Sequence, residues 1–181
     1  MSYRPEFEAA LLLFARVSEA MRARGLPAPV LVGGAAVELY STSAVATGDF
    51  DFCSIADSDL AIEMQRVGFI RPSGYPALLR GWVHPELKLG FEAVGTQVLD
   101  GAVDADHIRE AQTHDGSRFR VISVEDLIAD RMGQFASGTA PDRLEQARLL
   151  LRLHPDLDLE YLERRIRHES AGEYGVEDIE G

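Results

Sequence analysis

Two aspartates, Asp49 and Asp51, are the residues of this sequence whose types and spacing point most directly to chemistry. They lie in "TGDFDF", where polar and apolar residues alternate as in a half-buried strand. Residues two apart on a strand face the same side, so both carboxylates project together, away from Phe50 and Phe52. Paired carboxylates are costly to bury without a cation. The pair predicts a magnesium site, because Mg²⁺ takes one or two carboxylates and adds phosphate oxygens and water.

Three further Asp-x-Asp pairs show that this spacing alone does not identify a site. They fall at a predicted helix start, in a polar segment and after a proline, at positions 57 and 59, 104 and 106, and 156 and 158. Helix caps and solvated loops account for them. Glu92 is the candidate third carboxylate, because it is the one acid in the apolar run "LGFEAV". Its alternative is a solvent-facing residue of an antiparallel sheet.

A Gly-Gly pair, Gly33 and Gly34, follows a strand-like segment at 30–32 and precedes the helix-like "AAVELY". Glycines let a backbone approach a ligand closely, and a helix N-terminus presents free N–H groups with a partial positive charge. The pair is therefore a candidate phosphate-binding turn. The alternative is a tight turn with no ligand.

The elements that must position these residues are predicted from hydrophobic periodicity. Apolar spacings of three and four predict helices over 5–24 and 57–67. Strands are expected at 30–32, 49–55, 80–85, 86–94, 96–99 and 118–123. The later helices are expected from 123, over 141–153 and over 158–168, the first of them beginning with the capping-box spacing of Ser123 and Asp126.

This order of elements predicts an α/β (α+β) protein with a mixed sheet flanked by helices. We expect three parts: a sheet domain over 1–122 that includes the N-terminal helix, a small helical region over 123–168, and a flexible acidic tail over 169–181. The tail prediction depends on five carboxylates and no Lys or Arg in its 13 residues. A tail that binds a partner protein is the second interpretation.

Composition narrows the classes of partner. Thirty acidic and 18 basic residues give a formal charge of −12, which opposes broad binding to nucleic acid unless a local basic surface exists. No apolar stretch reaches the ~20 residues that span a bilayer, and the N-terminus is polar, so we expect a cytoplasmic protein with no membrane contact. The single cysteine, Cys53, cannot form an intramolecular disulfide and is interpreted as a buried thiol, with a redox role as the alternative.

Taken together, these motifs resemble the signature of the DNA polymerase beta-like nucleotidyltransferase superfamily. The matching residues are Gly33-Gly34, Thr47-Gly48-Asp49-Phe50-Asp51 and Glu92. Two later segments, "VISVEDLIADRMGQF" and "PDRLEQARLLL", resemble the AbiEii-type toxins and related uncharacterised bacterial nucleotidyltransferase-like proteins. The resemblance covers residues 28–153.

The resemblance implies a mixed sheet with metal-binding carboxylates on adjacent strands. Asp49 and Asp51 would hold two Mg²⁺ or Mn²⁺ ions, and Glu92 would complete one ion's shell or help to deprotonate the acceptor. Such paired metals suit phosphoryl-type transfer, which needs positioning and charge neutralisation at the attacking and leaving oxygens.

The resemblance also implies a nucleotide-binding set. The Gly33 and Gly34 amides would hold the triphosphate of a nucleoside triphosphate (NTP), and Thr47 and Arg131 complete the candidate residues. The chain departs from the family at three positions: Gly34 where many relatives have Ser, Val45 where many have Arg, and Arg131 where many have Lys. Arg131 could contact phosphate or form a structural ion pair, and both interpretations stay open.

Two functions follow as hypotheses. The first is a metal-dependent nucleotidyltransferase that moves a nucleoside monophosphate from an NTP to an unidentified small molecule, protein or RNA, with a toxin-like activity paired to an antitoxin as a sub-case. The second is a catalytically silent nucleotidyltransferase-like domain that binds a nucleotide or a partner protein.

Overall fold

A computed structural model describes residues 2–72, 81–87 and 89–180. The chain divides into two compact units, each described by itself below. The first unit comprises Met1–Ala36 and Ala46–Ile122, and the second comprises Val37–Val45 and Ser123–Gly181. The segment Val37–Val45 thus clusters with the second unit, whereas the sequence placed it within 1–122.

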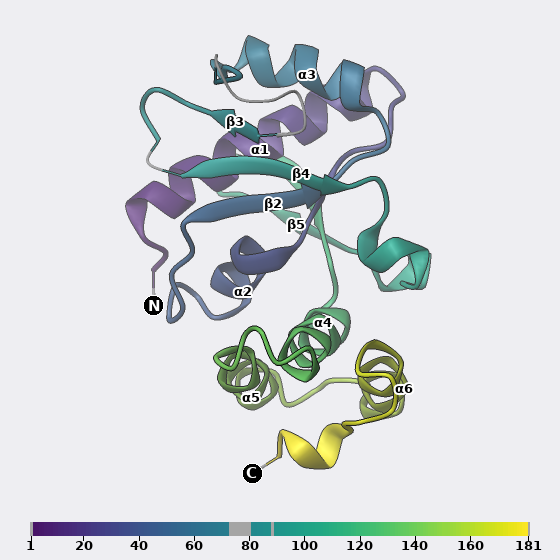
Figure 1. The fold of residues 1–181 in the computed structure, drawn as a ribbon. Helices are drawn as coiled ribbons and strands as arrows, with labels where there is room; N and C mark the ends of the chain where they lie inside the picture. Colours follow the sequence, from purple (N-terminus) through teal and green to yellow (C-terminus); the bar gives the residue numbers. More distant parts are fainter. Residues whose placement is uncertain (1, 73–80, 88, 181) are drawn as a thin grey trace. The chain divides into compact units, whose positions relative to one another are not determined.

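The first unit is built on a six-stranded mixed sheet with the strand order β3-β4-β2-β1-β6-β5. Figure 1 labels β2, β3, β4 and β5 of this sheet. Its strands are β1 (Val30–Leu31), β2 (Asp49–Cys53), β3 (Gly81–Val83), β4 (Gly90–Gly95), β5 (Arg109–Gln112) and β6 (Arg118–Val121). The central strand β2 runs parallel to β4 and antiparallel to β1, and β1 runs parallel to β6. The predicted mixed sheet is therefore confirmed.

Two strand assignments differ from the sequence prediction. The strand expected at 96–99 is wrong, because η1 (Val98–Gly101) is a 3₁₀ turn in which Leu99 and Asp100 have φ of 44° and 52°. Such left-handed residues cannot continue a strand. Conversely, β5 was not predicted, because its residues are mostly exposed polar ones and show no apolar alternation. Arg80 and Lys88, which belong to the strands expected at 80–85 and 86–94, lie outside the described residues. Strand β4 begins at Gly90, later than expected, because residues 85–86 form a turn.

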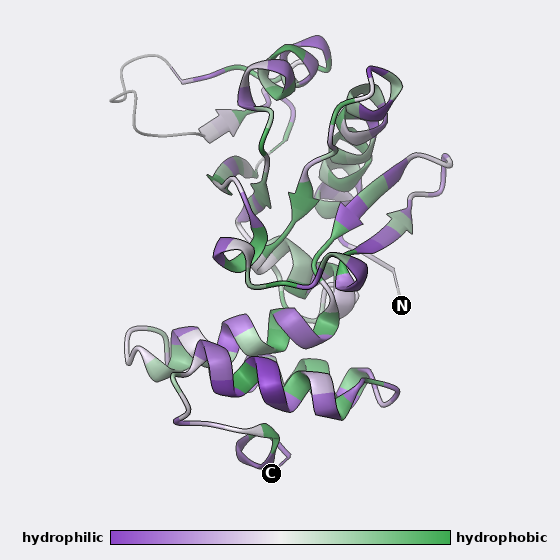
Figure 2. Ribbon diagram, turned by 90° about the vertical axis from the view of Figure 1, so that its right-hand side faces the viewer, coloured by the Kyte–Doolittle hydropathy of each residue, from purple (hydrophilic) through white to green (hydrophobic). Residues whose placement is uncertain are grey.

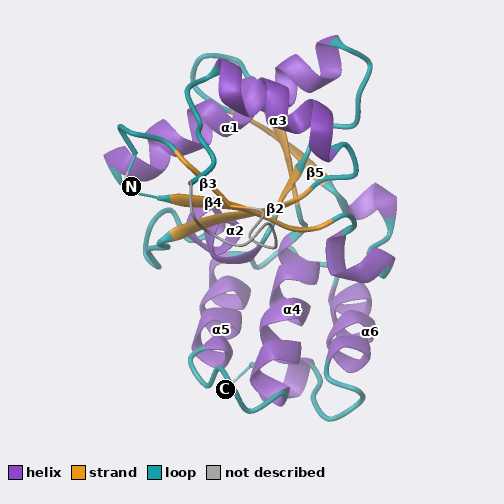
Figure 3. Ribbon diagram, turned by 45° about the horizontal axis from the view of Figure 1, so that its top comes forward, coloured by secondary structure: helices purple, strands orange, loops and turns teal. Residues whose placement is uncertain are grey.

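Helices α1 (Pro5–Ala23) and α3 (Asp57–Arg66) cover one face of this sheet (Figure 3). The Phe14 ring lies 5.7 Å from that of Phe52, and the Phe7 ring lies 5.2 Å from that of Phe50, between ring centroids. Both β2 phenylalanines are fully buried. Burial of the phenylalanine side of β2 against α1 leaves its aspartate side for the opposite face.

The turn between β5 and β6 is held by one carboxylate, Asp115. Its Oδ1 accepts hydrogen bonds from Thr113 Oγ1 at 2.7 Å and from the Ser117 N–H at 3.0 Å, and Arg16 Nη2 lies 3.3 Å from its Oδ2. The hydrogen bond from Thr113, followed by that from Ser117, holds the pKa of Asp115 well below its ordinary value of 3.8. This carboxylate therefore stabilises the folded chain in its charged form.

We expect Asp115→Asn to lower the free energy of unfolding at about pH 7, measured by urea denaturation. A depressed pKa contributes stability that is complete above the unfolded value and is lost as pH falls through the folded value. The difference between Asp115→Asn and wild type should therefore shrink below pH 3.8. The exposed Asp156→Asn serves as the control, and a difference for Asp115→Asn that is independent of pH would contradict this account.

The second unit is helical. Its helices are α4 (Val124–Ala136), α5 (Arg143–Leu153) and α6 (Leu159–Glu169), together with the end of α2 (Gly33–Tyr40). Its fully buried core side chains include Leu127, Ile128, Met132, Leu150, Leu162 and Ile166. Hydrophobic and hydrophilic residues alternate along these helices (Figure 2). Throughout the described ranges, no helix is both long enough and apolar enough to cross a membrane.

The acidic segment after α6 is packed, in contrast to the flexible tail that we expected. It forms the short helix η3 (Val176–Asp178), with Val176 and Ile179 buried. Glu163 Oε2 accepts a hydrogen bond from the Val176 N–H at 2.6 Å, and Asp178 Oδ2 accepts one from the Gly175 N–H at 2.8 Å. The carboxylates thus satisfy backbone donors while two apolar residues join the core, which composition alone could not reveal.

Candidate functional site

The three predicted carboxylates lie on one face of the sheet in the first unit. Strands β2 and β4 pair in parallel, with Asp49 opposite Gly90 and Asp51 opposite Glu92. Asp49 and Glu92 are exposed and Asp51 is half-buried, whereas the alternate residues of both strands are buried. Asp51 and Glu92 are therefore neighbours across adjacent strands, ~4.8 Å apart along the hydrogen-bonding direction.

Asp51 also lies directly against the first glycine of the turn. A Cβ on Gly33 would lie 2.9 Å from the Asp51 Cβ, and closer still to its carboxylate. The Val32 N–H donates to the Asp51 carbonyl at 2.9 Å, which aligns the end of β1 with β2. Gly33 also has φ +61°, a conformation that side chains disfavour. This glycine thus places the Asp51 carboxylate at the N-terminus of α2, where the helix dipole favours a negative charge.

The second glycine makes room for a hydroxyl. A Cβ on Gly34 would lie 2.5 Å from Thr47 Oγ1. That oxygen donates to the Asp49 carbonyl at 3.0 Å, and Arg4 Nη2 donates to the Thr47 carbonyl at 2.9 Å. Thr47 therefore fills the space that a side chain at position 34 would need. The Thr47 hydroxyl thus lies close to where the side chain of a serine would lie at position 34, the residue that many relatives have there.

Sequence reasoning missed two residues of this site. Gly90 lies beside Asp49, and a Cβ there would lie 3.0 Å from Asp49 Oδ1. A glycine inside a strand is a signal for such close approach, which could have identified it. The Arg4 guanidinium donates a hydrogen bond to the Thr47 carbonyl. An arginine thus contacts this motif, although position 45, where many relatives have Arg, holds a valine. No local pattern links Arg4 to a motif 43 residues away.

Arg131 belongs to the second unit, so its place relative to the carboxylates is not defined. It is 4% exposed, and its Nε donates to Asp130 Oδ2 at 3.2 Å. Asp130 also accepts from Gln134 Nε2 at 3.1 Å. The structure thus shows the ion pair that the sequence left as one of two interpretations. A contact with phosphate stays a prediction.

Within the described ranges, no three His, Cys, Asp or Glu side chains are arranged to hold a metal ion by themselves. The donor set on β2 and β4 is nevertheless of the kind that magnesium uses. Mg²⁺ needs only one or two carboxylates from the protein when substrate phosphates and water supply its other ligands. The residues present are therefore chemically compatible with such an ion.

Gly33→Ala should destabilise the protein more than Gly25→Ala, although both residues have positive φ, +61° and +71°. Alanine in the left-handed region costs about 1–2 kcal/mol, which is the whole effect expected at Gly25, where a Cβ would meet nothing within 4 Å. At Gly33 the contact with Asp51 adds about 1–3 kcal/mol. Urea denaturation measures both, and equal losses would show that Asp51 moves aside freely.

Comparisons with known structures define the class of fold, which is that of nucleotidyltransferase-like proteins. The antibiotic-resistance factor ANT(2'')-Ia aligns with 90% of this chain and 92% of its own, with a TM-score of 0.58 and 18% identity. An antigenic nucleotidyltransferase-like protein from Paracoccidioides brasiliensis aligns with 95% of this chain and 90% of its own, with a TM-score of 0.61 and 12% identity. No protein-family model and no curated protein matches the sequence. The predicted fold class is confirmed.

Proposed function

We propose that this protein is a metal-dependent nucleotidyltransferase that transfers a nucleoside monophosphate from an NTP to an acceptor. One observation carries the proposal: Asp51 contacts the Gly33 turn at the start of α2 and is paired in register with Glu92 on β4. Carboxylates for a metal and a helix N-terminus for phosphate thus meet at one point of the sheet. The nucleotidyltransferase-like fold supports this assignment.

Asp49 and Asp51 would hold Mg²⁺ or Mn²⁺, with Glu92 as a further ligand or as the base. The bound metal would neutralise charge on the attacking and leaving oxygens. Asp49 has room for this because its neighbour on β4 is glycine.

The remaining residues would bind and orient the NTP. The backbone N–H groups at Gly33 and Gly34 would receive the triphosphate, and the Thr47 hydroxyl lies in the space beside Gly34. The acceptor oxygen would attack the α-phosphorus, the bond to the β-phosphate oxygen would break, and pyrophosphate would leave. In the role of base, Glu92 would take the proton of the acceptor hydroxyl.

A catalytically silent nucleotidyltransferase-like domain is the second candidate. It is favoured by the lack of a complete three-residue metal cluster within the described residues and by the ion pair of Arg131 with Asp130. Such a domain would bind a nucleotide or a partner protein without transfer. The AbiEii-type, toxin-like sub-case is a finer form of the first candidate, and inhibition of growth on expression would test it.

A label-transfer assay separates the candidates. The protein is incubated with each NTP labelled at the α-phosphate, with Mg²⁺ or Mn²⁺, and with small hydroxyl acceptors, pooled RNA or cell extract. Asp49→Asn/Asp51→Asn should abolish transfer. Asp104→Asn/Asp106→Asn, which removes two charges from an exposed Asp-x-Asp pair, should not. Transfer that survives the first double substitution would refute the site, and tight NTP binding without transfer would favour the silent domain.

A further inference from the structure

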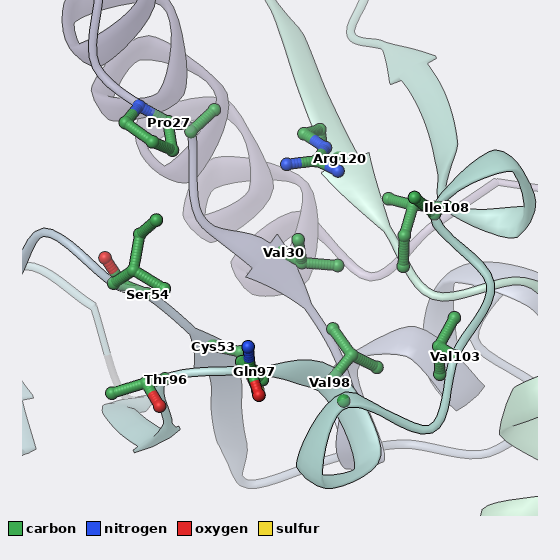
Figure 4. A pocket seen from close by; sticks show the side chains of 14 residues that line it. Pro27, Val30, Cys53, Ser54, Thr96, Gln97, Val98, Val103, Ile108 and Arg120 are labelled. Carbon is green, nitrogen blue, oxygen red and sulfur yellow. The ribbon is translucent and has the colours of Figure 1, made fainter.

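A pocket of about 460 Å³ lies in the first unit at the end of β2 that is remote from the Gly33 turn (Figure 4). Its walls come from the segment before β1, the end of β2, the loop after β4 and strand β6. Pockets of 300–1,000 Å³ are typical of small-molecule sites. None of the residues proposed above for nucleotidyl transfer lines this pocket.

The strand register places the pocket along the same face as the carboxylates but apart from them. Cys53 lines the pocket and follows Asp51 by two residues on β2, which corresponds to ~6.7 Å along the strand. Val30 is paired with Cys53 on one side and with Arg120 on the other. The Asp51 carboxylate, in contrast, lies against Gly33, beyond the other end of β1.

Arg120 gives the pocket a positively charged group. Its side chain is half-buried on β6 and has no hydrogen-bond or ion-pair partner in the described part of the chain. Arg118, on the same strand, differs: its guanidinium is paired with Glu19 at 2.9 Å and with Glu110 at 3.4 Å. A guanidinium that lines a pocket and is not already paired can form charge-assisted hydrogen bonds with an anionic ligand.

The rest of the lining is mostly apolar. Val30, Val98, Val103 and Ile108 line the pocket around Arg120, with Ser54, Thr96 and Gln97 as its polar groups (Figure 4). One wall is the loop after β4, which holds two non-glycine residues, Leu99 and Asp100, in the left-handed region. Strained backbone of this kind persists only where the surrounding structure enforces it, and it clusters at ligand sites.

We propose that this pocket binds a small organic anion whose carboxylate or phosphate pairs with Arg120 and whose apolar body contacts the Val and Ile side chains. The net charge of −12 repels anions from the molecule as a whole, so binding of an anion here would depend on Arg120. The site does not depend on the proposed nucleotidyl transfer, and a separate binding experiment tests it.

Three probes with the same ring test this site by NMR: benzoate, phenyl phosphate and the neutral benzyl alcohol. We expect the anions to shift the methyl signals of Val30, Val98 and Ile108 and the Arg120 Nε–H signal, and benzyl alcohol to bind about tenfold more weakly, since one charge-assisted hydrogen bond accounts for a factor of that size. Comparison of the two anions shows which head group the pocket prefers.

Matched variants decide the role of Arg120. Arg120→Met should reduce the affinity for both anions to that for benzyl alcohol, whereas Arg120→Lys should keep most of it. Arg109→Met removes the same charge from an exposed position on β5 and should change little. Val103→Phe should fill the pocket and weaken all three probes. Unshifted methyl signals, equal anion binding by folded Arg120→Met, or shifts centred on Gly33 would each overturn the proposal.

Discussion

Asp51→Asn is expected to lower the rate of nucleotidyl transfer by about 10³-fold and to lower the free energy of unfolding by no more than about 1 kcal/mol, the contribution of a negative charge at a helix N-terminus. Asparagine has the shape of aspartate, so its contact with Gly33 at the start of α2 is kept. Only the charge is lost, and with it the metal ligand. A bound metal contributes several kcal/mol of charge stabilisation in the transition state, and each 1.36 kcal/mol is a factor of ten in rate.

Initial rates at saturating NTP, measured with the acceptor found in the label-transfer assay, test this prediction. Glu92→Gln should lose about 10²-fold in rate, the contribution expected of a general base. Asp106→Asn, which removes one charge from an exposed position, is the matched control for charge. Retention of more than a tenth of the wild-type rate by a folded Asp51→Asn variant would rule out β2 as the reaction centre.

Asp126→Ala is expected to destabilise the second unit by about 3–5 kcal/mol, the range for removal of one partner from a buried ion pair. Asp126 is fully buried, and its carboxylate accepts hydrogen bonds from Ser123 Oγ at 2.7 Å, the Tyr161 hydroxyl at 3.0 Å and Arg165 Nε at 2.7 Å. It thereby joins the start of α4 to α6. Without it, the buried Arg165 guanidinium keeps its contact with Glu169 at 2.7 Å as its remaining ion pair among the described residues.

Urea denaturation of three variants separates the charge from the helix cap. Ser123→Ala should cost about 1 kcal/mol, because the Ser123 hydroxyl accepts the Asp126 N–H at 3.0 Å as an N-cap. Asp126→Ala/Arg165→Met should be more stable than Asp126→Ala alone, because the double substitution also removes the buried guanidinium that has lost Asp126, and the Glu169 carboxylate that loses Arg165 is only half-buried. If the double variant were the less stable of the two, the ion pair would not be the source of the loss.

The cap at Ser123 shows which contacts a local sequence pattern can predict and which it cannot. The spacing of Ser123 and Asp126 predicted a capping box, and the structure confirms the half in which Ser123 accepts the Asp126 N–H. Besides the Ser123 hydroxyl, the Asp126 carboxylate bonds residues 35 and 39 positions later. Neighbours in sequence determine the start of a helix, whereas its buried partners come from elsewhere in the fold.

The predictions of a flexible acidic C-terminal segment and of a strand at 96–99 differ from the structure for a related reason. Both predictions used composition over a short window. Burial of Val176 and Ile179, and the left-handed Leu99 and Asp100, depend on contacts outside those windows. In the same way β5 is a strand because it pairs with β6, although its own residues carry no strand pattern.

The sequence by itself determined the elements of the site: a strand with both aspartates on one face, a glycine turn before a helix, and a separate acid in an apolar run. These depend on periodicity and on backbone preference, which are local properties. Only the tertiary structure decided that Glu92 pairs with Asp51, that Gly33 lies against Asp51, and that Thr47 fills the space beside Gly34. Strand register and close packing arise between segments far apart in the chain, so no local pattern encodes them.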